Sequence, residues 1–335
     1  MEPDSAETRW SVVVCAYTFE RLELTTACIR AVLAQPERPE VIVVTDHNDE
    51  LGTALRERFP TVRVVPNGQR RGLGGARNSG VEASSRALVA FVDDDAEPSP
   101  RWLSALGAPF ADARVAVVGG DAEPVWQGAT PSWFPDEYLW VVGCSYRGMA
   151  REGVVRNPLG CNMAFRRQTL VDVGGFDETL GRLGSLPFGL EETELCVRLT
   201  RANPSSRIVM AEGAAVRHHV PPGRQRPSYF LQRCFYEGIG KAQLRDLASS
   251  AALSSERSYA LRVLPVAVIR DLAGIIRLDR PLTRLKRIGA VVGGLAAAAA
   301  GYGWGRLRSI RTPPSSAATA HSSAAPTSAA VPSDD

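Results

Sequence analysis

The chain has 335 residues, of which 44% are hydrophobic, enough for a sizeable packed core. Lysine and arginine number 39 against 36 aspartates and glutamates, and the net charge of +3 argues against a dedicated nucleic-acid-binding protein. The six cysteines form no Cys-x-x-Cys pair, and the polar first nine residues lack the basic-then-apolar plan of a secretory signal. We therefore expect a cytoplasmic protein with reduced thiols and no nucleic-acid partner.

Strand-like and helix-like segments alternate through the first ninety residues. Apolar spacing predicts helices at 22–33, 51–59 and 76–86, and apolar runs predict buried strands at 10–17, 41–46, 62–66 and 87–92. This alternation is typical of an α/β domain with a mainly parallel central sheet flanked by helices. The carboxyl ends of parallel strands meet at one edge of a sheet, so ligand-binding residues are expected there.

Three consecutive carboxylates, Asp93, Asp94 and Asp95, follow the fourth predicted strand. Like charges in contact raise one another's pKa, so a bound divalent cation or cationic side chains would relieve the repulsion. The triplet alone fits a solvated acidic turn equally well. Tyr17 and Asp46 end the first two predicted strands. An aromatic ring and several carboxylates are thus predicted to share one crevice, as in a nucleotide site, although plain packing of Tyr17 and turn capping by Asp46 remain alternatives.

The turn at 67–75 is rich in glycine and superficially resembles a dinucleotide fingerprint. That fingerprint follows the first strand of its fold, whereas this turn precedes the fourth, so a nicotinamide site is not expected. Arg70, Arg71 and Arg77 lie close enough in sequence to approach a diphosphate, and a solvated basic loop is the alternative.

The next part of the chain is predicted to form a helix at 102–110, a strand at 113–119, and an aromatic-rich segment at 126–146 that either fills a second core layer or stacks on sugar or lipid. Helical spacing resumes at Glu191. Carboxylates in a first helical turn suit the helix dipole, and one of them could also deprotonate an acceptor hydroxyl. Short strands are predicted at 207–210 and 214–216. His218 follows them and could complete a metal site with the aspartates, and a structural hydrogen-bonding role is the alternative.

The C-terminal third is predicted to be helical, beginning with 229–247. The apolar run 259–278 carries four charged residues, which suits an interfacial or packed helix. The uncharged run 288–305 is short and rich in alanine and glycine for a membrane span. We expect membrane-surface association, with a spanning or a soluble packed helix as the alternatives. The predicted divisions are a polar tail (1–9), a catalytic domain (10–222), a membrane-associated helical extension (223–311) and a disordered tail (312–335).

Several of these segments occur in the order found in the family 2 inverting glycosyltransferases, which have the GT-A nucleotide-diphospho-sugar transferase fold. The chain resembles that family from Ser11 to Val220. The similar segments are the first strand and base-stacking loop (Ser11–Tyr17), the second strand (Val43–Asp46), the glycine turn with its helix (Asn67–Gly80), the DxD motif (Phe91–Asp95), the acceptor-side segments (Gly160–Arg166 and Val173–Asp177) and the ED motif (Glu191–Arg198).

The resemblance implies a set of site residues. Mg²⁺ or Mn²⁺ is expected on Asp95, Asp93 and His218. The catalytic base is expected at Glu192, where the family more often has aspartate, or at Glu191. Contacts to a nucleoside-diphosphate sugar are expected from Ala16, Tyr17, Asp46, Arg71, Arg77, Asn78, Asp93 and Asp94. The segments Trp140–Arg147 and Glu191–Glu194 also resemble a subgroup labelled glucosyl-dolichyl-phosphate glucuronosyltransferase-like.

The expected function is that of an inverting glycosyltransferase at the cytoplasmic face of the membrane. It would move a sugar from a nucleoside-diphosphate sugar to a hydroxyl of a glycan, lipid-linked or small-molecule acceptor. A sugar-nucleotidyltransferase is an alternative, although no basic pyrophosphate loop directly follows the first strand. A non-catalytic, membrane-attached scaffold is the other.

Overall fold

The structure is a computed structural model that describes residues 9–179, 189–247 and 257–311. The tail predicted at 312–335, and all but one residue of the tail predicted at 1–9, lie outside the described residues. Within them, nine strands form one sheet in the order β3-β2-β1-β4-β8-β6-β9-β5, with β7 paired to β9. The strands are β1 (Trp10–Ala16), β2 (Glu40–Thr45), β3 (Arg63–Pro66), β4 (Leu88–Asp93), β5 (Ala96–Pro98), β6 (Val115–Trp126), β7 (Gly153–Val154), β8 (Asn162–Arg166) and β9 (Arg207–Val220).

The sheet is mixed in direction. Strands β3, β2, β1 and β4 are parallel, as predicted for the first half of the chain, and β6 and β9 are also parallel. Strand β8 runs antiparallel between β4 and β6 and joins the two parallel groups. The short strand β5 pairs antiparallel with β9, with Ala96 opposite His218. This pairing brings the residues that follow β4 to the side of β9.

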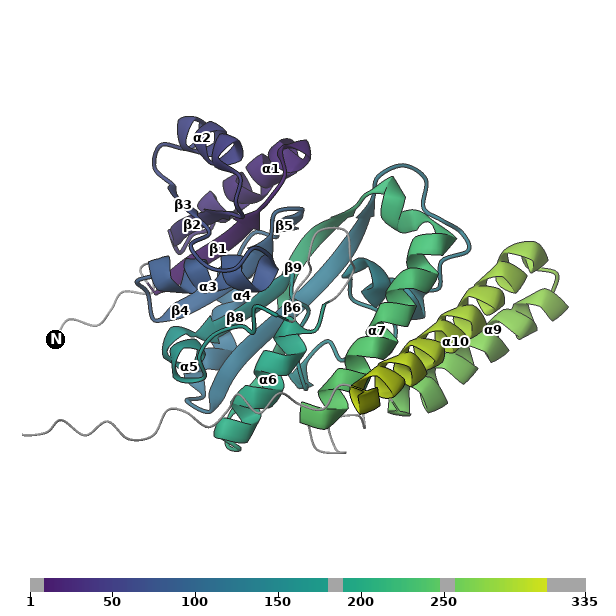
Figure 1. Cartoon of the computed structure of the whole chain (residues 1–335). Helices are drawn as coiled ribbons and strands as arrows, with labels where there is room; N and C mark the ends of the chain where they lie inside the picture. The colour runs from purple at the N-terminus through teal and green to yellow at the C-terminus, as the bar shows by residue number, and fades with distance from the viewer. Residues whose placement is uncertain (1–8, 180–188, 248–256, 312–335) are drawn as a thin grey trace, which may run out of the picture.

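The described helices flank the sheet or gather at one end of it (Figure 1). The predicted helix 22–33 has the observed bounds, whereas the helix predicted at 76–86 begins earlier, at Leu73, and ends at Ala83. The α-helices are α1 (Leu22–Leu33), α2 (Asp49–Arg58), α3 (Leu73–Ala83), α4 (Trp102–Gly107), α5 (Arg167–Asp172), α6 (Glu191–Ala202), α7 (Pro227–Leu247), α9 (Leu264–Ile276) and α10 (Pro281–Arg311). Short 3₁₀ helices are η2 (Phe19–Arg21), η3 (Ala108–Ala111), η4 (Asp136–Val142) and η5 (Pro222–Gln225), and η7 (Tyr259–Val263) is a π-helical turn.

Two apolar layers cover the two faces of the sheet. Successive residues of a strand point to opposite faces, so Val12 and Val14 of β1 pack in the layer with α1, α2 and α4, while Val13 packs in the layer with α3, α5 and α6. Because both faces are covered, the central parallel strands β1, β2 and β4 are almost continuously apolar, which is why their apolar runs were recognisable in the sequence.

The second layer contains a set of aromatic rings around Phe91 that offers a stability test. Phe91 is 2% exposed, and its ring centroid lies 5.9 Å from that of Phe165 and 5.4 Å from that of Phe176, both edge to face. Replacing Phe91 with alanine should lower the free energy of unfolding by about 3–5 kcal/mol, since apolar area is lost and a cavity remains. Urea unfolding checks this, with Phe91→Leu as the milder control. Equal stability of the alanine variant and the wild type would contradict the packing described.

A third apolar cluster joins the C-terminal helices to the sheet domain. Tyr138 and Val142 of η4 pack with Phe230 of α7 and Val291 of α10, and the Tyr138 hydroxyl donates to the Val291 carbonyl over 3.0 Å. Helices α7 and α10 approach so closely that a Cβ at Gly238 would lie 2.0 Å from the Ala298 carbonyl oxygen. The C-terminal helices are therefore packed against the sheet domain.

Several predicted elements are corrected by long-range pairing. The strands predicted at 207–210 and 214–216 are one strand, β9, which passes through Gly213 at a φ of +78°. Strand β6 continues past the predicted end, to Trp126, because it pairs with β9 on both sides of a register shift. The run 288–305 lies inside the longer helix α10. Within α10, the segment Pro281–Arg308 is long and apolar enough to cross a membrane, judged by length and composition alone.

Candidate active site

The acidic triplet lies where β4 ends and β5 begins, beside β9. Asp94 and Asp95 are buried, and Asp93 is half-buried. One ligand atom each from Asp93, Asp95 and His218 lies within 4.8 Å of the other two. The structure thus brings together the three side chains predicted to hold a metal, although His218 is more than a hundred residues away in sequence.

Cationic side chains surround the triplet. Arg21 Nη1 lies 2.8 Å from Asp94 Oδ1 and 2.9 Å from Asp95 Oδ2, and His218 Nε2 lies 3.2 Å from Asp95 Oδ1. Burial would raise the pKa of Asp95, but the charges of His218 and Arg21 outweigh it and hold that pKa well below its usual range. Burial and the neighbouring Asp95 raise the pKa of Asp94 to about 7. Asp95 is therefore the more firmly ionised of the two.

The triplet can accept further ligands. Asp94 Oδ2 is buried and makes no hydrogen bond with a described residue, and the two buried carboxylate oxygens of Asp95 contact cations without a hydrogen bond of good geometry. Buried carboxylate oxygens are normally satisfied. Carboxylate oxygens together with an imidazole nitrogen form a donor set that suits Mn²⁺ and Mg²⁺. The residues present fit the predicted metal.

Arg77 is buried between the triplet and helix α6. Its Nη2 lies 3.5 Å from Asp93 Oδ1 and donates to the Gly160 carbonyl over 2.9 Å, and its Nη1 lies 3.2 Å from Glu191 Oε1. The side chain is 2% exposed. We predicted that Arg77 would approach a diphosphate from the glycine turn. The structure instead places its guanidinium inside the protein, where it links the acidic triplet to α6.

The two neighbouring glutamates of α6 have different surroundings. Glu191 is 3% exposed, pairs with Arg77, and accepts a hydrogen bond from the Leu190 amide over 3.0 Å. Glu192 is half-buried and lines a cavity. Burial, followed by the charge of Glu191, raises the pKa of Glu192 to about 7. Of the two candidates for the base, Glu192 is the one that lines the cavity.

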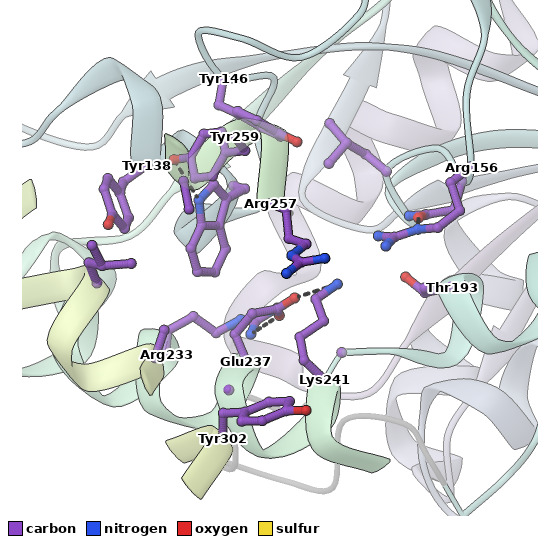
Figure 2. A pocket seen from close by; sticks show the side chains of 18 of the residues that line it. Tyr138, Tyr146, Arg156, Thr193, Arg233, Glu237, Lys241, Arg257, Tyr259 and Tyr302 are labelled. Atoms are coloured by element: carbon purple, nitrogen blue, oxygen red, sulfur yellow. Dashed lines mark hydrogen bonds and ion pairs between the residues drawn. The ribbon is translucent and has the colours of Figure 1, made fainter. Parts of the chain in front are cut away.

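The cavity beside Glu192 has a volume of about 450 Å³ (Figure 2). Aromatic residues of η4, of the segment that follows η4 and of η7 form one wall of the cavity. Charged residues of α7 form a row along another side, and apolar residues of α10 also contribute to the lining. The residues of the wall are Tyr138, Trp140, Tyr146 and Tyr259, and those of the row are Arg233, Glu237 and Lys241. Figure 2 shows Arg257 in the space between the wall and the row. The cavity offers rings for stacking and cations for an anionic group.

The charged row is held by ion pairs. Glu237 lies 2.8 Å from Arg233 Nη1 and 3.1 Å from Lys241 Nζ. Burial would raise the pKa of Glu237, but the two cations outweigh it and lower that pKa to about 2. Glu237 is thus ionised and partly neutralises the row, which leaves the row with a net positive charge.

The predicted base-binding residues lie at the ends of β1 and β2. Ala16 is buried, and its carbonyl accepts a hydrogen bond from the Asp46 amide over 2.8 Å. Tyr17 is 48% exposed, with the Arg21 guanidinium 5.3 Å from its ring centroid. The Asp46 carboxylate accepts from Asn67 Nδ2 over 2.7 Å and from the Gly72 amide over 3.0 Å. The structure therefore leaves the Tyr17 ring open to a ligand and engages Asp46 in the glycine turn.

The other two predicted donor contacts also lie around this turn. Asn78 Nδ2 donates to the Phe176 carbonyl and to Glu178, and Asn78 Oδ1 accepts from the Phe176 amide. This side chain ties α3 to the segment after α5. Arg71 is exposed, and no residue of the described ranges forms an ion pair with it. The structure does not bring either residue into contact with the acidic triplet.

Several site residues were not predicted. Arg21 and Arg224 approach the triplet from distant segments, with Arg224 Nη1 3.9 Å from Asp95 Oδ2, and Cys144 Sγ lies 3.5 Å from His218 Nδ1. No local pattern in the sequence marks these three. The charged row of α7 does have a signal, because Arg233, Glu237 and Lys241 are spaced four residues apart and so share one helix face.

Comparisons with known proteins identify the family of this chain. The profile of the family described as Glycosyl transferase family 2 matches residues 11–174. The chain is 31% identical over 303 residues to a glucosyl-dolichyl phosphate glucuronosyltransferase of Haloferax volcanii, covering 89% of this chain and 96% of that protein. It is 26% identical to the glycosyltransferase AglE of the same organism, over 58% of this chain and 64% of that protein.

A solved structure confirms the predicted GT-A fold. The mannosyltransferase PcManGT of Pyrobaculum calidifontis, in complex with GDP-Man and Mn²⁺, superposes with a TM-score of 0.59 and 19% identity, covering 88% of this chain and 87% of that one. At this identity the likeness concerns the fold. The sequence similarity along nearly the whole chain identifies the function class, and the chain belongs to glycosyl transferase family 2 and is a glycosyltransferase.

Proposed function

We propose that the protein is an inverting, metal-dependent glycosyltransferase that moves a sugar from a nucleoside-diphosphate sugar to a hydroxyl of a lipid-linked acceptor. The observation that carries the proposal is the position of Glu192. Glu192 lines an acceptor-sized cavity, and the neighbouring Glu191 is connected through the buried Arg77 to the acidic triplet. A base and a metal-binding cluster thus belong to one connected site.

On the donor side, Asp95, Asp93 and His218 would hold Mg²⁺ or Mn²⁺. When bound, the ion would neutralise the negative charge that develops on the leaving diphosphate. The exposed ring of Tyr17 is placed to stack on the base of the nucleotide. The complex of the structurally similar mannosyltransferase with GDP-Man and Mn²⁺ supports this donor and metal class.

On the acceptor side, we assign the cavity lined by Glu192. The aromatic wall is suited to the face of a sugar ring, and Arg257 and Lys241 are suited to a phosphate group. Leu264 and Leu295 continue the lining as an apolar surface for a lipid chain. A sugar carried on a polyprenyl phosphate combines these three features, and the name of the Haloferax volcanii relative points to the same class of acceptor.

The proposed reaction is a single displacement. Glu192 accepts the proton of the acceptor hydroxyl while the hydroxyl oxygen attacks the anomeric carbon from the face opposite the diphosphate. The bond from the anomeric carbon to the diphosphate oxygen breaks, and the electron pair leaves with the diphosphate. No covalent bond between sugar and enzyme is needed, so one carboxylate is sufficient and the anomeric configuration inverts.

The raised pKa of Glu192 predicts the pH dependence of transfer. A base must be deprotonated to act, so kcat/KM should rise with increasing pH and level off above the pKa of about 7. The measurement is kcat/KM from about pH 6 to about pH 8, with circular dichroism at each pH to show that the fold is unchanged. A profile that is flat across this range would contradict the assignment of the base.

The donor can be identified by thermal unfolding. A panel of nucleotide sugars is added with Mn²⁺, and the true donor should raise the unfolding temperature because it binds only the folded state. Turnover with that donor should release a nucleoside diphosphate. Release of pyrophosphate from a nucleoside triphosphate would instead favour the sugar-nucleotidyltransferase, and binding without any turnover would favour a scaffold.

We also propose that the helical extension lies on the cytoplasmic face of the membrane. Large apolar side chains of α9 and α10 and the turns beside them face outward, with basic residues among them. The exposed apolar residues are Leu261, Val266, Ile269, Leu272, Ile276, Leu278, Leu282, Leu285, Val292, Trp304 and Leu307. Such a surface suits insertion into the interfacial region of a bilayer, beside the cavity that would take the lipid-linked acceptor.

A further inference from the structure

A second cavity, of about 790 Å³, lies between the loop that precedes η4 and the turn that joins α9 to α10. It is separate from the cavity of Glu192, and the two share no lining residue. Six arginines and three aspartates line it, which leaves an excess of three positive charges. The arginines are Arg147, Arg270, Arg277, Arg280, Arg284 and Arg287. In a chain whose net charge is +3, this is a local concentration of cations.

The inner part of this arginine cluster is structural. Asp271 is 2% exposed and lies 3.0 Å from Arg284 Nη1 and 3.4 Å from Arg287 Nε. The buried Glu137 lies 2.9 Å from Arg270 Nη1. These ion pairs fasten the α9–α10 hairpin to η4, and they use three of the six arginines. A fourth, Arg147, pairs with Asp136.

The outer part of the arginine cluster contains two arginines that form no ion pair with a described residue. Arg277 and Arg280 are exposed at the hairpin turn, and neither has an ion-pair partner within hydrogen-bonding reach among the residues that the structure describes. Helix α10 begins at Pro281, so the amide groups of its first turn also lie at this cavity, with the Thr283 side chain in the lining. Exposed guanidinium groups that form no ion pair and a helix N-terminus both favour a phosphate.

The surroundings indicate where the phosphate comes from. Ile276 and Leu278 are each 82% exposed and Leu282 is 74% exposed, and all three flank the turn that carries the two free arginines. Figure 1 shows this turn at the end of the α9–α10 hairpin, away from the strands. A site for a soluble phosphate needs no such apolar rim, whereas a lipid phosphate lies directly above acyl chains.

We propose that this second cavity binds the phosphate of an anionic membrane lipid through Arg277 and Arg280. The site rests on the proposed membrane placement of the extension and is independent of the transfer chemistry. It would fix the orientation of the hairpin, and through the ion pairs of Glu137 the orientation of η4, whose Tyr138 and Trp140 line the acceptor cavity.

The test is co-sedimentation of the full chain with vesicles of phosphatidylcholine, and with vesicles of an equal mixture of phosphatidylcholine and phosphatidylglycerol. The variant is Arg277→Gln with Arg280→Gln. The matched control is Arg262→Gln with Lys286→Gln, which removes the same charge from exposed positions of the extension outside the cavity. Each surface cation contributes a similar electrostatic attraction to anionic vesicles, so both variants lose this contribution equally. Only the first should lose a further factor of about ten or more in affinity for the mixed vesicles.

The outcomes separate the possible readings. Equal losses in the two variants would overturn the site and leave only a general basic surface. A second outcome is that glycerol phosphate raises the unfolding temperature of the wild type but not that of the first variant, while the two variants bind vesicles equally. This outcome would assign the cavity to a soluble phosphate. Failure of the wild type to bind any vesicle would overturn both the membrane placement and the site. Transfer to a detergent-dispersed acceptor should be unchanged in both variants, so it tests the proposed chemistry separately.

Discussion

Replacing Glu192 with glutamine is expected to lower the rate of sugar transfer by about a hundredfold to ten-thousandfold, the range typical of a lost general base. Glutamine has nearly the same shape but cannot accept the proton of the acceptor hydroxyl. Donor affinity should stay close to that of the wild type, because Glu192 faces the acceptor cavity rather than the acidic triplet. Initial rates and donor titrations by calorimetry measure the two effects separately.

Two neighbours on α6 provide controls for this substitution. Glu194→Gln removes a carboxylate that pairs with Arg198, and it should retain transfer. Glu191→Gln breaks the buried pair with Arg77 and should lower the unfolding temperature. Glu192→Gln should unfold at the wild-type temperature or above it, since burial disfavours the charged carboxylate at this position. Wild-type turnover by Glu192→Gln would refute its role as the base.

Replacing Asp95 with asparagine is expected to reduce metal-dependent transfer by about a hundredfold or more, because charge neutralisation by a metal contributes several kcal/mol to the transition state. Asp95 is the predicted ligand held most firmly in its ionised form, beside His218 and Arg21. The variant should also need a higher Mn²⁺ concentration for donor binding. Calorimetric titration with a nucleotide sugar at several Mn²⁺ concentrations measures this shift.

The control for Asp95 must exclude a general loss of stability. Removing one partner of a buried ion pair destabilises a protein, so thermal unfolding of Asp95→Asn has to be measured alongside binding. Asp121→Asn is the matched substitution, because Asp121 pairs with Arg151 outside the triplet. It should leave Mn²⁺ dependence unchanged. An identical Mn²⁺ requirement in the wild type and Asp95→Asn would argue against a metal at this site.

The sequence was most informative where local patterns determine the structure. The helix at 22–33 and the strands that lead to Tyr17, Asp46 and Asp93 follow from periodicity, since buried parallel strands are continuously apolar. The proximity of Asp93, Asp95 and His218 was also expected, because all three lie in recognisable motifs. The GT-A fold and the family followed from the order of these motifs.

Features that depend on long-range contacts were not predictable. Strand β9 appeared as two short strands because Gly213 interrupts its apolar pattern, whereas its pairing with β6 makes it continuous. Arg77 was expected near the glycine turn, within reach of a diphosphate, yet its side chain is buried against Gly160 and against Glu191 of α6, which lie far along the chain. The acceptor cavity combines η4, α6, α7 and η7, and its existence depends on how the C-terminal helices pack.

The anomeric configuration of the product tests the central claim most directly. Once the donor is identified, its sugar is transferred to a polyprenyl-phosphate-linked acceptor, and the proton coupling at the anomeric carbon is measured by NMR in donor and product. A single displacement assisted by Glu192 predicts the opposite configuration in the product, for example a β-linked sugar from an α-linked donor. Retention of the donor's configuration would contradict the proposed mechanism.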